Sequence, residues 1–344
     1  MTEWRLLEPF RDQLARCDLR AGEIVAVLSE SSSRRDLVAA ARLAAQILGG
    51  RVYDVVVPTP PNPGPVAIRS TGASVALAGN PGVIAALAAA DLVVDCTVEG
   101  LLHAPELGAI LGEGTRILMV SNEHPESFER YAHDETLRPR VERAVELLAA
   151  AREMRVTSVA GTDLRIQLDE AFCAGSWGST QGPGSIAHWP GGLALAFPRA
   201  GSVEGTLVLA PGDLNLTFKS YVREAITLRV VDDHVEAIEG AGIDAELFRS
   251  YLAAFGDRAA YATSHVGFGM NRTARWDYLE LYDRSQINGT EARAFAGNFL
   301  YSTGANEVAE RFTAGHFDLP MRGCTVALDG RVVVDSGVLQ GELA

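Results

Sequence analysis

The first 122 residues alternate short apolar runs with helical segments, and this alternation limits the possible folds more than any other feature. Runs rich in Val, Ile and Leu predict strands at residues 23–30, 51–58, 91–97 and 116–122. The segments between them, such as the one that opens with SSRRD and stops at GG, carry the end signals of helices. Strands and helices that alternate at this spacing favour a parallel, doubly wound sheet.

The pattern changes after about residue 150. Short strands separated by Gly, Asp and Pro turns follow one another from residue 155, and one clear helix is expected at residues 244–257. We therefore predict a Rossmann-like α/β domain at residues 1–150. An α+β domain with mostly antiparallel strands would occupy residues 151–344, behind a long amphipathic helix near residues 134–154.

The charge and the apolar runs argue against several classes of function. The net charge of −14 disfavours nucleic acids and anionic membranes as partners. The longest apolar run, at residues 81–100, is interrupted by Asp91 and Asp95, so it predicts a helix and a buried strand rather than a membrane span. No GxGxxG follows the first strand, and a nucleotide-binding function therefore has little support.

The N-terminus and the cysteines favour a cytoplasmic protein. The first 16 residues are charged and lack the apolar core of a secretory signal. The cysteines are too far apart for a zinc site, and we expect reduced thiols in the core. They are Cys17, Cys96, Cys173 and Cys324.

The stretch GHFDLP places His316 and Asp318 two residues apart. On a strand these side chains would point to one face and could reach one common point, as in a metal site with a third ligand from elsewhere. A chance pair on a surface strand is the alternative. His265 lies in SHVGFG among small residues, where a core histidine bonded to a carbonyl is also possible. Two histidines and one carboxylate form the facial set of non-haem iron(II) oxygenases, which leaves positions for substrate and dioxygen.

The other histidines differ in what surrounds them. His103 follows the third strand of the first domain, at the sheet edge where doubly wound folds bind ligands. His188 lies in a loop before a strand, and a functional and a structural role are equally open for it. His124, His133 and His234 lie in charged or hairpin segments, and we expect them to be solvated.

Several motifs occur in the same order as in a known family. ADLVVD…LLHAPE, HWPGG, EGTLVL, SHVGFG, ARAFAGNFLYSTG and GHFDLPMRGC resemble 2,5-dihydroxypyridine 5,6-dioxygenases, within the thermophilic metallo-aminopeptidase superfamily, over nearly the whole chain. The resemblance implies an aminopeptidase T-like fold and a homo-oligomer. It also implies Fe(II)-dependent ring cleavage, in which 2,5-dihydroxypyridine and O₂ give N-formylmaleamate during nicotine or nicotinate degradation.

The resemblance also assigns roles to individual residues. It implies that His265, His316 and Asp318 hold the iron and that His103 is the base that deprotonates the substrate. His188 and Ser302 would bind substrate, although Ser302 could equally be an ordinary turn serine. Arg293 would orient a ligand carboxylate or form a surface salt bridge, and Trp189 would stack on a flat ring or belong to the core.

The departures from related patterns are informative. Leu193 stands where an aminopeptidase would carry a metal-binding glutamate, His265 replaces a second glutamate, and an apolar residue near Leu300 replaces a histidine. Only His316 and Asp318 remain in common, which implies one metal ion instead of two. The stretch CAGSWGSTQGPGSIAHWP lacks the acidic, substrate-facing residue that we expect in the dioxygenases, so the substituents of the ring remain open.

Two other functions remain possible at this point. One is a mononuclear metal-dependent hydrolase, either an aromatic aminohydrolase or an aminopeptidase, which would need no oxygen and would tolerate Mn²⁺ or Zn²⁺. The other is a non-catalytic binding domain with a decayed site, which would hold no stable metal.

Overall fold

The N-terminal part of the chain forms a five-stranded parallel sheet in the order β2-β1-β3-β4-β8. The protein is described here from a computed structural model, which covers residues 4–61, 74–120, 122–131 and 134–344. The first four strands of the chain confirm the predicted ones to within about two residues at each end. Their bounds are β1 (Ile24–Glu30), β2 (Arg51–Val57), β3 (Leu92–Asp95) and β4 (Arg116–Val120).

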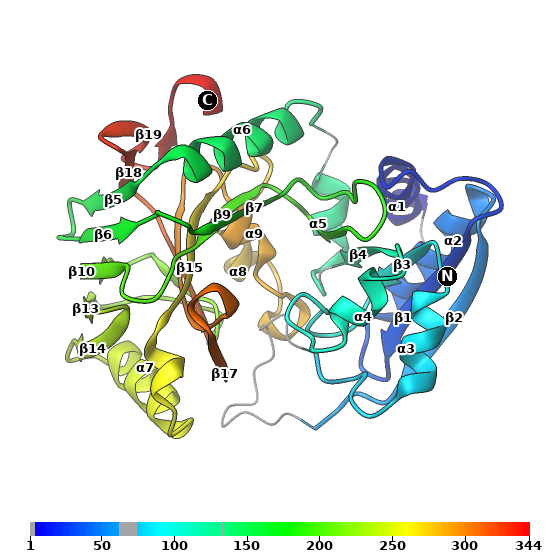
Figure 1. Ribbon diagram of the computed structural model, residues 1–344, viewed down its shortest axis with the longest axis horizontal. Helices are drawn as coiled ribbons and strands as arrows, with labels where there is room; N and C mark the ends of the chain where they lie inside the picture. The colour runs from blue at the N-terminus through cyan, green and yellow to red at the C-terminus, as the bar shows by residue number, and fades with distance from the viewer. Residues whose placement is uncertain (1–3, 62–73, 121, 132–133) are drawn as a thin grey trace.

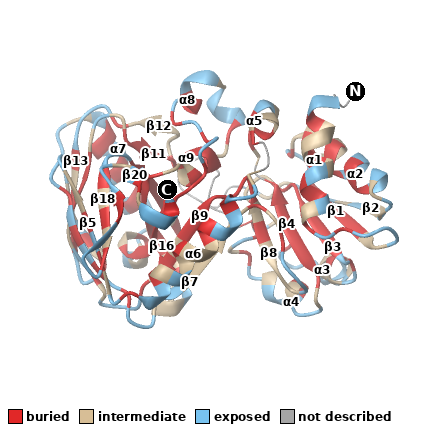
Figure 2. Ribbon diagram, turned by 90° about the horizontal axis from the view of Figure 1, so that it is seen from above, coloured by how far each residue is buried: buried red, intermediate tan, exposed pale blue. Residues whose placement is uncertain are grey.

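Helices cover both faces of this sheet, which explains why its central strands are buried along nearly their whole length and are mostly apolar (Figure 2). One face packs against α1 (Trp4–Arg16), α2 (Arg35–Ile47) and α5 (Pro125–Arg130). The other face packs against α3 (Pro81–Ala88) and α4 (Leu107–Leu111). The predicted α/β architecture is therefore confirmed for this half.

The fifth strand of the parallel sheet corrects two of the sequence-based expectations. It is β8 (Ile186–Trp189), which pairs in parallel with β4 and places His188 opposite Met119. His188 thus lies on a strand and not in a loop. The four residues of β8 are too few, and too closely flanked by Gly and Pro, to stand out in the sequence. A segment from beyond residue 150 therefore completes the N-terminal sheet, so the sheets do not divide strictly at that residue.

The C-terminal half contains an eight-stranded sheet, a five-stranded sheet and a two-stranded one (Figure 1). All the strand pairs in these sheets are antiparallel, as predicted. The eight-stranded sheet has the order β14 (His234–Glu239), β13 (Ile226–Val231), β10 (Val203–Leu209), β6 (Asp163–Gln167), β5 (Glu153–Ser158), β18 (Cys324–Leu328), β19 (Arg331–Asp335) and β20 (Val338–Leu339). The five-stranded sheet has the order β17 (Arg311–Met321), β16 (Phe299–Asn306), β15 (Thr263–Gly269), β9 (Leu193–Phe197) and β7 (Phe172–Ser176), and β11 (Leu214–Asn215) pairs with β12 (Ser220–Tyr221).

Both large antiparallel sheets share one hydrophobic core. The predicted amphipathic helix is α6 (Leu137–Ala150), and the predicted helix at residues 244–257 is α7 (Ile243–Ala254); both bury apolar side chains in this core. Short elements complete the half: α8 (Tyr278–Leu281), α9 (Thr290–Ala294), η1 (Arg258–Tyr261), η2 (Arg284–Gln286), η3 (Glu307–Ala309) and η4 (Gly341–Leu343). In Figure 1, α5, α8 and α9 stand between the parallel sheet and the antiparallel sheets.

The remaining expectations from composition concern the cysteines and the membrane. The four cysteines are free, as predicted, and three of them are buried while Cys173 is partly buried. Within the part of the chain that the structure describes, no helix combines the length and apolar character that crossing a bilayer requires.

Candidate metal and substrate site

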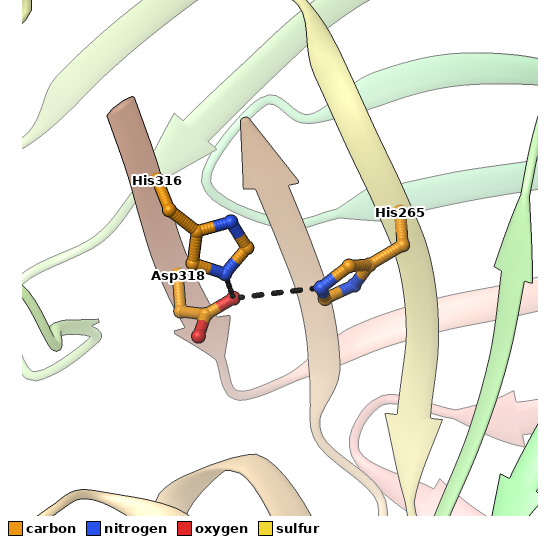
Figure 3. A group of neighbouring side chains, drawn as sticks. All are labelled: His265, His316 and Asp318. Atoms are coloured by element: carbon orange, nitrogen blue, oxygen red, sulfur yellow. Dashed lines mark ion pairs between the residues drawn. The ribbon is translucent and has the colours of Figure 1, made fainter. Parts of the chain in front are cut away.

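Two strands of the five-stranded sheet bring His265, His316 and Asp318 to one point (Figure 3). His316 and Asp318 share a face of β17, as the spacing predicted, and His265 comes from β15, on the other side of β16. The Nε2 atoms of His316 and His265 lie 3.3 and 3.9 Å from Oδ1 of Asp318. One donor atom from each residue falls within 4.8 Å of the others, which is the separation expected around a single metal ion.

A local irregularity of the sheet sets the orientation of the His265 side chain. The register between β15 and β16 shifts between Thr263 and Val266, so His265 lies inside a bulge. A bulge bends its strand and redirects the side chains that it contains. This bulge depends on the pairing of distant strands, and the local sequence SHVGFG does not predict it.

Asp318 is held by two partners in addition to the histidines. The Ser302 hydroxyl donates to Oδ1, and Nε of Arg293 donates to Oδ2 at 2.6 Å. Asp318 is 4% exposed, and burial alone would raise its pKa. Arg293 and His316 outweigh that effect and hold the pKa well below the ordinary value of an aspartate. The carboxylate is therefore ionised at neutral pH.

His265 is held in the neutral form. Burial, opposed only in part by Asp318, lowers the pKa of its imidazole to about 3. Its ring centroid lies 5.2 Å from that of Phe197. Its Nδ1 is buried and has no hydrogen-bond partner among the described residues, whereas its Nε2 faces Asp318.

The donor set fits a divalent transition metal. A metal ion requires a neutral imidazole and an ionised carboxylate, and the burial of His265 and the charge of Arg293 provide these states. Two imidazoles and one carboxylate are the donors of the facial site found in non-haem iron enzymes. The same three residues are the only group of this kind in the described part of the chain.

His103 reaches this group from the parallel sheet. It lies in the loop that follows β3, as predicted, and its ring centroid is 5.8 Å from that of His316. Burial, with a smaller effect of His316, lowers the pKa of His103 to about 4. The imidazole is therefore neutral at pH 7 and has a lone pair that can accept a proton.

The loop that carries His103 is organised by Asp95, at the end of β3. Oδ1 of Asp95 accepts hydrogen bonds from the backbone N–H and the hydroxyl of Thr97, at 2.9 and 2.7 Å. Oδ2 accepts from the backbone N–H of Leu101 at 2.9 Å. These bonds fix the backbone two residues before His103. The sequence analysis named Asp95 only as an interruption of an apolar run, although its place at the end of a buried strand is a usable signal for a site residue.

His188 also belongs to the parallel sheet. Its Nδ1 lies 3.3 Å from the carbonyl oxygen of Pro190, and the hydroxyl of Ser176 donates to its backbone carbonyl at 3.1 Å. Burial, followed by the positive charge of Arg293, lowers the pKa of His188 to about 4. The charge of Arg293, which bonds to Asp318, therefore also acts on His188.

Comparison with known proteins decides the family. A family model described as 2,5-dihydroxypyridine 5,6-dioxygenase matches residues 5–341. A curated protein of that name from Pseudomonas putida is 40% identical over 337 residues, which are 97% of this chain and 95% of the relative. The chain belongs to the 2,5-dihydroxypyridine 5,6-dioxygenase family.

Solved structures agree with this assignment. The 2,5-dihydroxypyridine dioxygenase of Pseudomonas putida KT2440 matches with a TM-score of 0.93 and 38% identity, and the match covers 98% of both chains. AmpT from Thermus thermophilus matches with a TM-score of 0.63 and 15% identity over 98% of this chain and 99% of that one. The second likeness shows the fold alone. The resemblance inferred from the motifs is confirmed, and so is the expected fold class.

Two of the three positions that differ from the aminopeptidase pattern are apolar in this dioxygenase-family chain. Leu193 and Leu300 pack together with Ala294, and Leu195 lies against them. Such a cluster offers no ligand for a second metal ion. The geometry therefore agrees with a single three-residue group on β15 and β17.

Three other side chains occupy places that the sequence left open. The ring centroid of Trp189 lies 4.9 Å from that of Phe10 and 4.5 Å from that of Phe128. Trp189 is therefore a core residue and does not stack on a substrate ring. Ser302 is fully buried in the middle of β16 and is not a turn serine. Arg293 contacts Asp318 directly, in place of a surface salt bridge.

The remaining histidines lie outside this group. His124 caps α5 and stacks on Tyr282, and His234 begins β14 with its Nδ1 at 2.7 Å from the carbonyl oxygen of Asp232. Both are only partly exposed, so the expectation of fully solvated side chains was too simple. His133 lies outside the described residues.

Proposed function

We propose that this chain is an iron(II)-dependent dioxygenase that cleaves the ring of a hydroxylated pyridine. The first candidate reaction is 2,5-dihydroxypyridine plus O₂ to N-formylmaleamate, in which both oxygen atoms enter the product. The observation that carries the proposal is the convergence of His265, His316 and Asp318 in a chain that is 40% identical to the Pseudomonas putida enzyme. The family name supplies the substrate class, and the three side chains supply the site.

Iron(II) is the metal that this donor set suits. Three protein ligands leave open coordination positions, so that a bound iron would hold substrate and dioxygen side by side and provide a path for electrons between them. Arg293 and Ser302 keep the Asp318 carboxylate ionised and oriented. Because the hydroxyl hydrogen of Ser302 is already donated to Asp318, we now assign Ser302 first to that carboxylate and only second to the substrate.

His103 is the residue that we assign to proton transfer. Its neutral imidazole lies beside His316 and can accept the proton of a ring hydroxyl, which makes the substrate a better ligand and electron donor. His188, near Arg293, would orient the ring from the edge strand β8. In this arrangement the parallel sheet supplies the residue that accepts the proton, and the antiparallel sheet supplies the metal ligands.

The proposal extends to the setting of the enzyme. We assign it to cytoplasmic degradation of nicotinate-type N-heteroaromatic compounds, as a homo-oligomer with small-molecule partners only. The free cysteines and the net charge of −14 agree with this setting.

Oxygen uptake tests the proposal. The purified protein is loaded with Fe²⁺ under anaerobic conditions, mixed with 2,5-dihydroxypyridine and exposed to air, while O₂ and the ultraviolet band of the ring are followed together. Loss of the band with one equivalent of O₂ supports ring cleavage. Loss of the band without O₂ uptake, or turnover sustained by Zn²⁺ under anaerobic conditions, would show a hydrolase instead.

A further inference from the structure

A second buried carboxylate, Glu123, connects the parallel sheet to the metal site. It follows β4 and is fully buried. Oε1 accepts the backbone N–H groups of Gly289 and Thr290, each at 2.7 Å, and Oε2 accepts that of Asn288 at 3.0 Å. Three backbone N–H groups of one turn thus converge on a single buried carboxyl group, which holds the turn in place.

The turn held by Glu123 leads directly to the residues around the metal site. The side-chain oxygen of Asn288 accepts a hydrogen bond from Nη1 of Arg293 at 3.2 Å. The backbone N–H of Arg293 donates to the carbonyl of Gly289 at 3.3 Å. Nε of Arg293 then donates to Oδ2 of Asp318 at 2.6 Å. A continuous set of hydrogen bonds thus runs from Glu123 to the candidate ligand Asp318.

We propose that Glu123 is a positioning residue of the metal centre, which acts across the interface between the two sheets through Asn288 and Arg293. This inference rests on the proposed metal site. Without the Glu123 carboxyl group, the turn at residues 288–290 loses its side-chain acceptor. Arg293 then loses the support of Asn288, and its Nε no longer fixes Asp318 in the orientation that a metal requires.

Glu291 provides an internal comparison. It is also fully buried, lies in α9 and crosses the same interface. Its carboxylate bonds to Arg130 at 2.8 Å, to Ser127 at 3.2 Å and to the backbone N–H of Arg275 at 2.9 Å. These bonds hold the interface without passing through Asn288 to Arg293. Glu123 and Glu291 therefore separate the effect of interface stability from the effect on the metal.

The test compares Glu123→Gln, Glu291→Gln and Asn288→Ala in the full chain. The dissociation constant for Fe²⁺ is measured under anaerobic conditions by competition with a chromogenic Fe²⁺ chelator, and Tm and the kcat and KM of the loaded enzyme are recorded beside it. The amide of Glu123→Gln places N–H donors against backbone N–H groups, so we expect the Fe²⁺ dissociation constant to rise about 10- to 100-fold. Glu291→Gln should lower Tm and leave the Fe²⁺ dissociation constant within about twofold of wild type.

Asn288→Ala keeps the inference testable if Glu123→Gln fails to fold. It removes the acceptor for Arg293 and leaves the Glu123 bonds to the backbone in place, so weaker Fe²⁺ binding with nearly unchanged Tm supports the inference. Wild-type affinity for Fe²⁺ in both Glu123→Gln and Asn288→Ala would overturn it, as would an equal loss of affinity in Glu291→Gln. A wild-type protein that binds no Fe²⁺ would overturn the proposed function itself, and the role of Glu123 with it.

Discussion

The two halves of the molecule build their parts of the site in different ways. The antiparallel sheet supplies His265, His316 and Asp318 from strands that are joined through β16. The parallel sheet supplies His103 from a loop and His188 from its edge strand. A backbone ladder therefore sets the distances among the three candidate metal ligands. The position of His103 depends instead on the side-chain bonds of one loop.

This difference predicts two kinds of variant. Substitutions on β15 to β17 should weaken metal binding first, and turnover should fall as a consequence. Substitutions on the parallel sheet should leave metal binding unchanged and should alter proton transfer or the orientation of the substrate. The largest effect on iron content and turnover should come from substitution of Asp318.

Asp318→Ala should remove bound iron and turnover together. It deletes one of three ligands and also breaks the buried ion pair with Arg293, which costs roughly 3–5 kcal/mol of folding free energy. Iron content after gel filtration, O₂ uptake and Tm measure the three consequences. Asp318→Asn is the control that keeps a hydrogen-bond acceptor for Arg293. Full turnover in Asp318→Ala with no metal would remove these residues from the site.

His103→Ala should have the next largest effect, and of the other kind. We expect iron content equal to wild type and a kcat lower by about 10²- to 10⁴-fold, as for the loss of a general base. His103→Gln fills the space without a basic nitrogen of comparable strength, so it should be as slow as His103→Ala. If His103→Gln restored turnover, His103 would serve to orient the substrate and not to take its proton.

The fold was predictable where burial leaves a regular pattern. β1, β3 and β4 are buried on both faces because helices cover both, and this gives mostly apolar runs that mark the strands closely. β8 was missed because four residues between glycines and prolines carry no periodicity, and its partner β4 lies 66 or more residues away in the sequence. Pairing between distant segments is the information that local patterns lack.

The site was predictable to a similar extent. The alternation of a strand is enough to place His316 and Asp318 on one face, and the end of a parallel strand is enough to suggest His103. The other members of the site depend on contacts across the fold. Ser302 reaches Asp318 from a neighbouring strand, and Glu123 reaches Asn288 across 165 residues of sequence. Their neighbours in the sequence do not indicate these partners.

Ser302→Ala tests how much metal binding depends on the hydrogen bond from Ser302 to Asp318. The hydroxyl donates to Oδ1 of Asp318, the oxygen that faces both histidines. Its loss should weaken Fe²⁺ binding about tenfold, measured by chelator competition. Thr303→Val is a matched control on the same strand, because the Thr303 hydroxyl is buried without a partner among the described residues. Equal affinities in the two variants would contradict the assigned role of Ser302.

Asp95→Asn should have the smallest effect on turnover, and it tests the loop on the parallel sheet. Only one oxygen remains, so the amide would oppose the N–H of Thr97 or that of Leu101, and the backbone before His103 would shift. We expect a loss of several-fold in kcat with unchanged iron content. A variant with wild-type kcat would show that the loop holds His103 without this carboxylate.

The same variant carries a signature in the pH dependence of stability. Burial, opposed in part by the bonds from Thr97, raises the pKa of Asp95 to about 6 from the ordinary 3.8. The folded state therefore binds a proton more tightly than the unfolded state, and this contribution to the free energy of unfolding is present below pH 3.8 and lost as the pH rises through 6. Its size is about 2–3 kcal/mol, from 1.36 kcal/mol per unit of pKa. Asp95→Asn removes a titrating group from this window, so its unfolding free energy, measured with urea at several pH values, should fall less steeply than that of wild type between pH 4 and 6. Parallel curves would mean that Asp95 is ionised in the folded protein throughout the window, and the loop would then be held by a permanent negative charge.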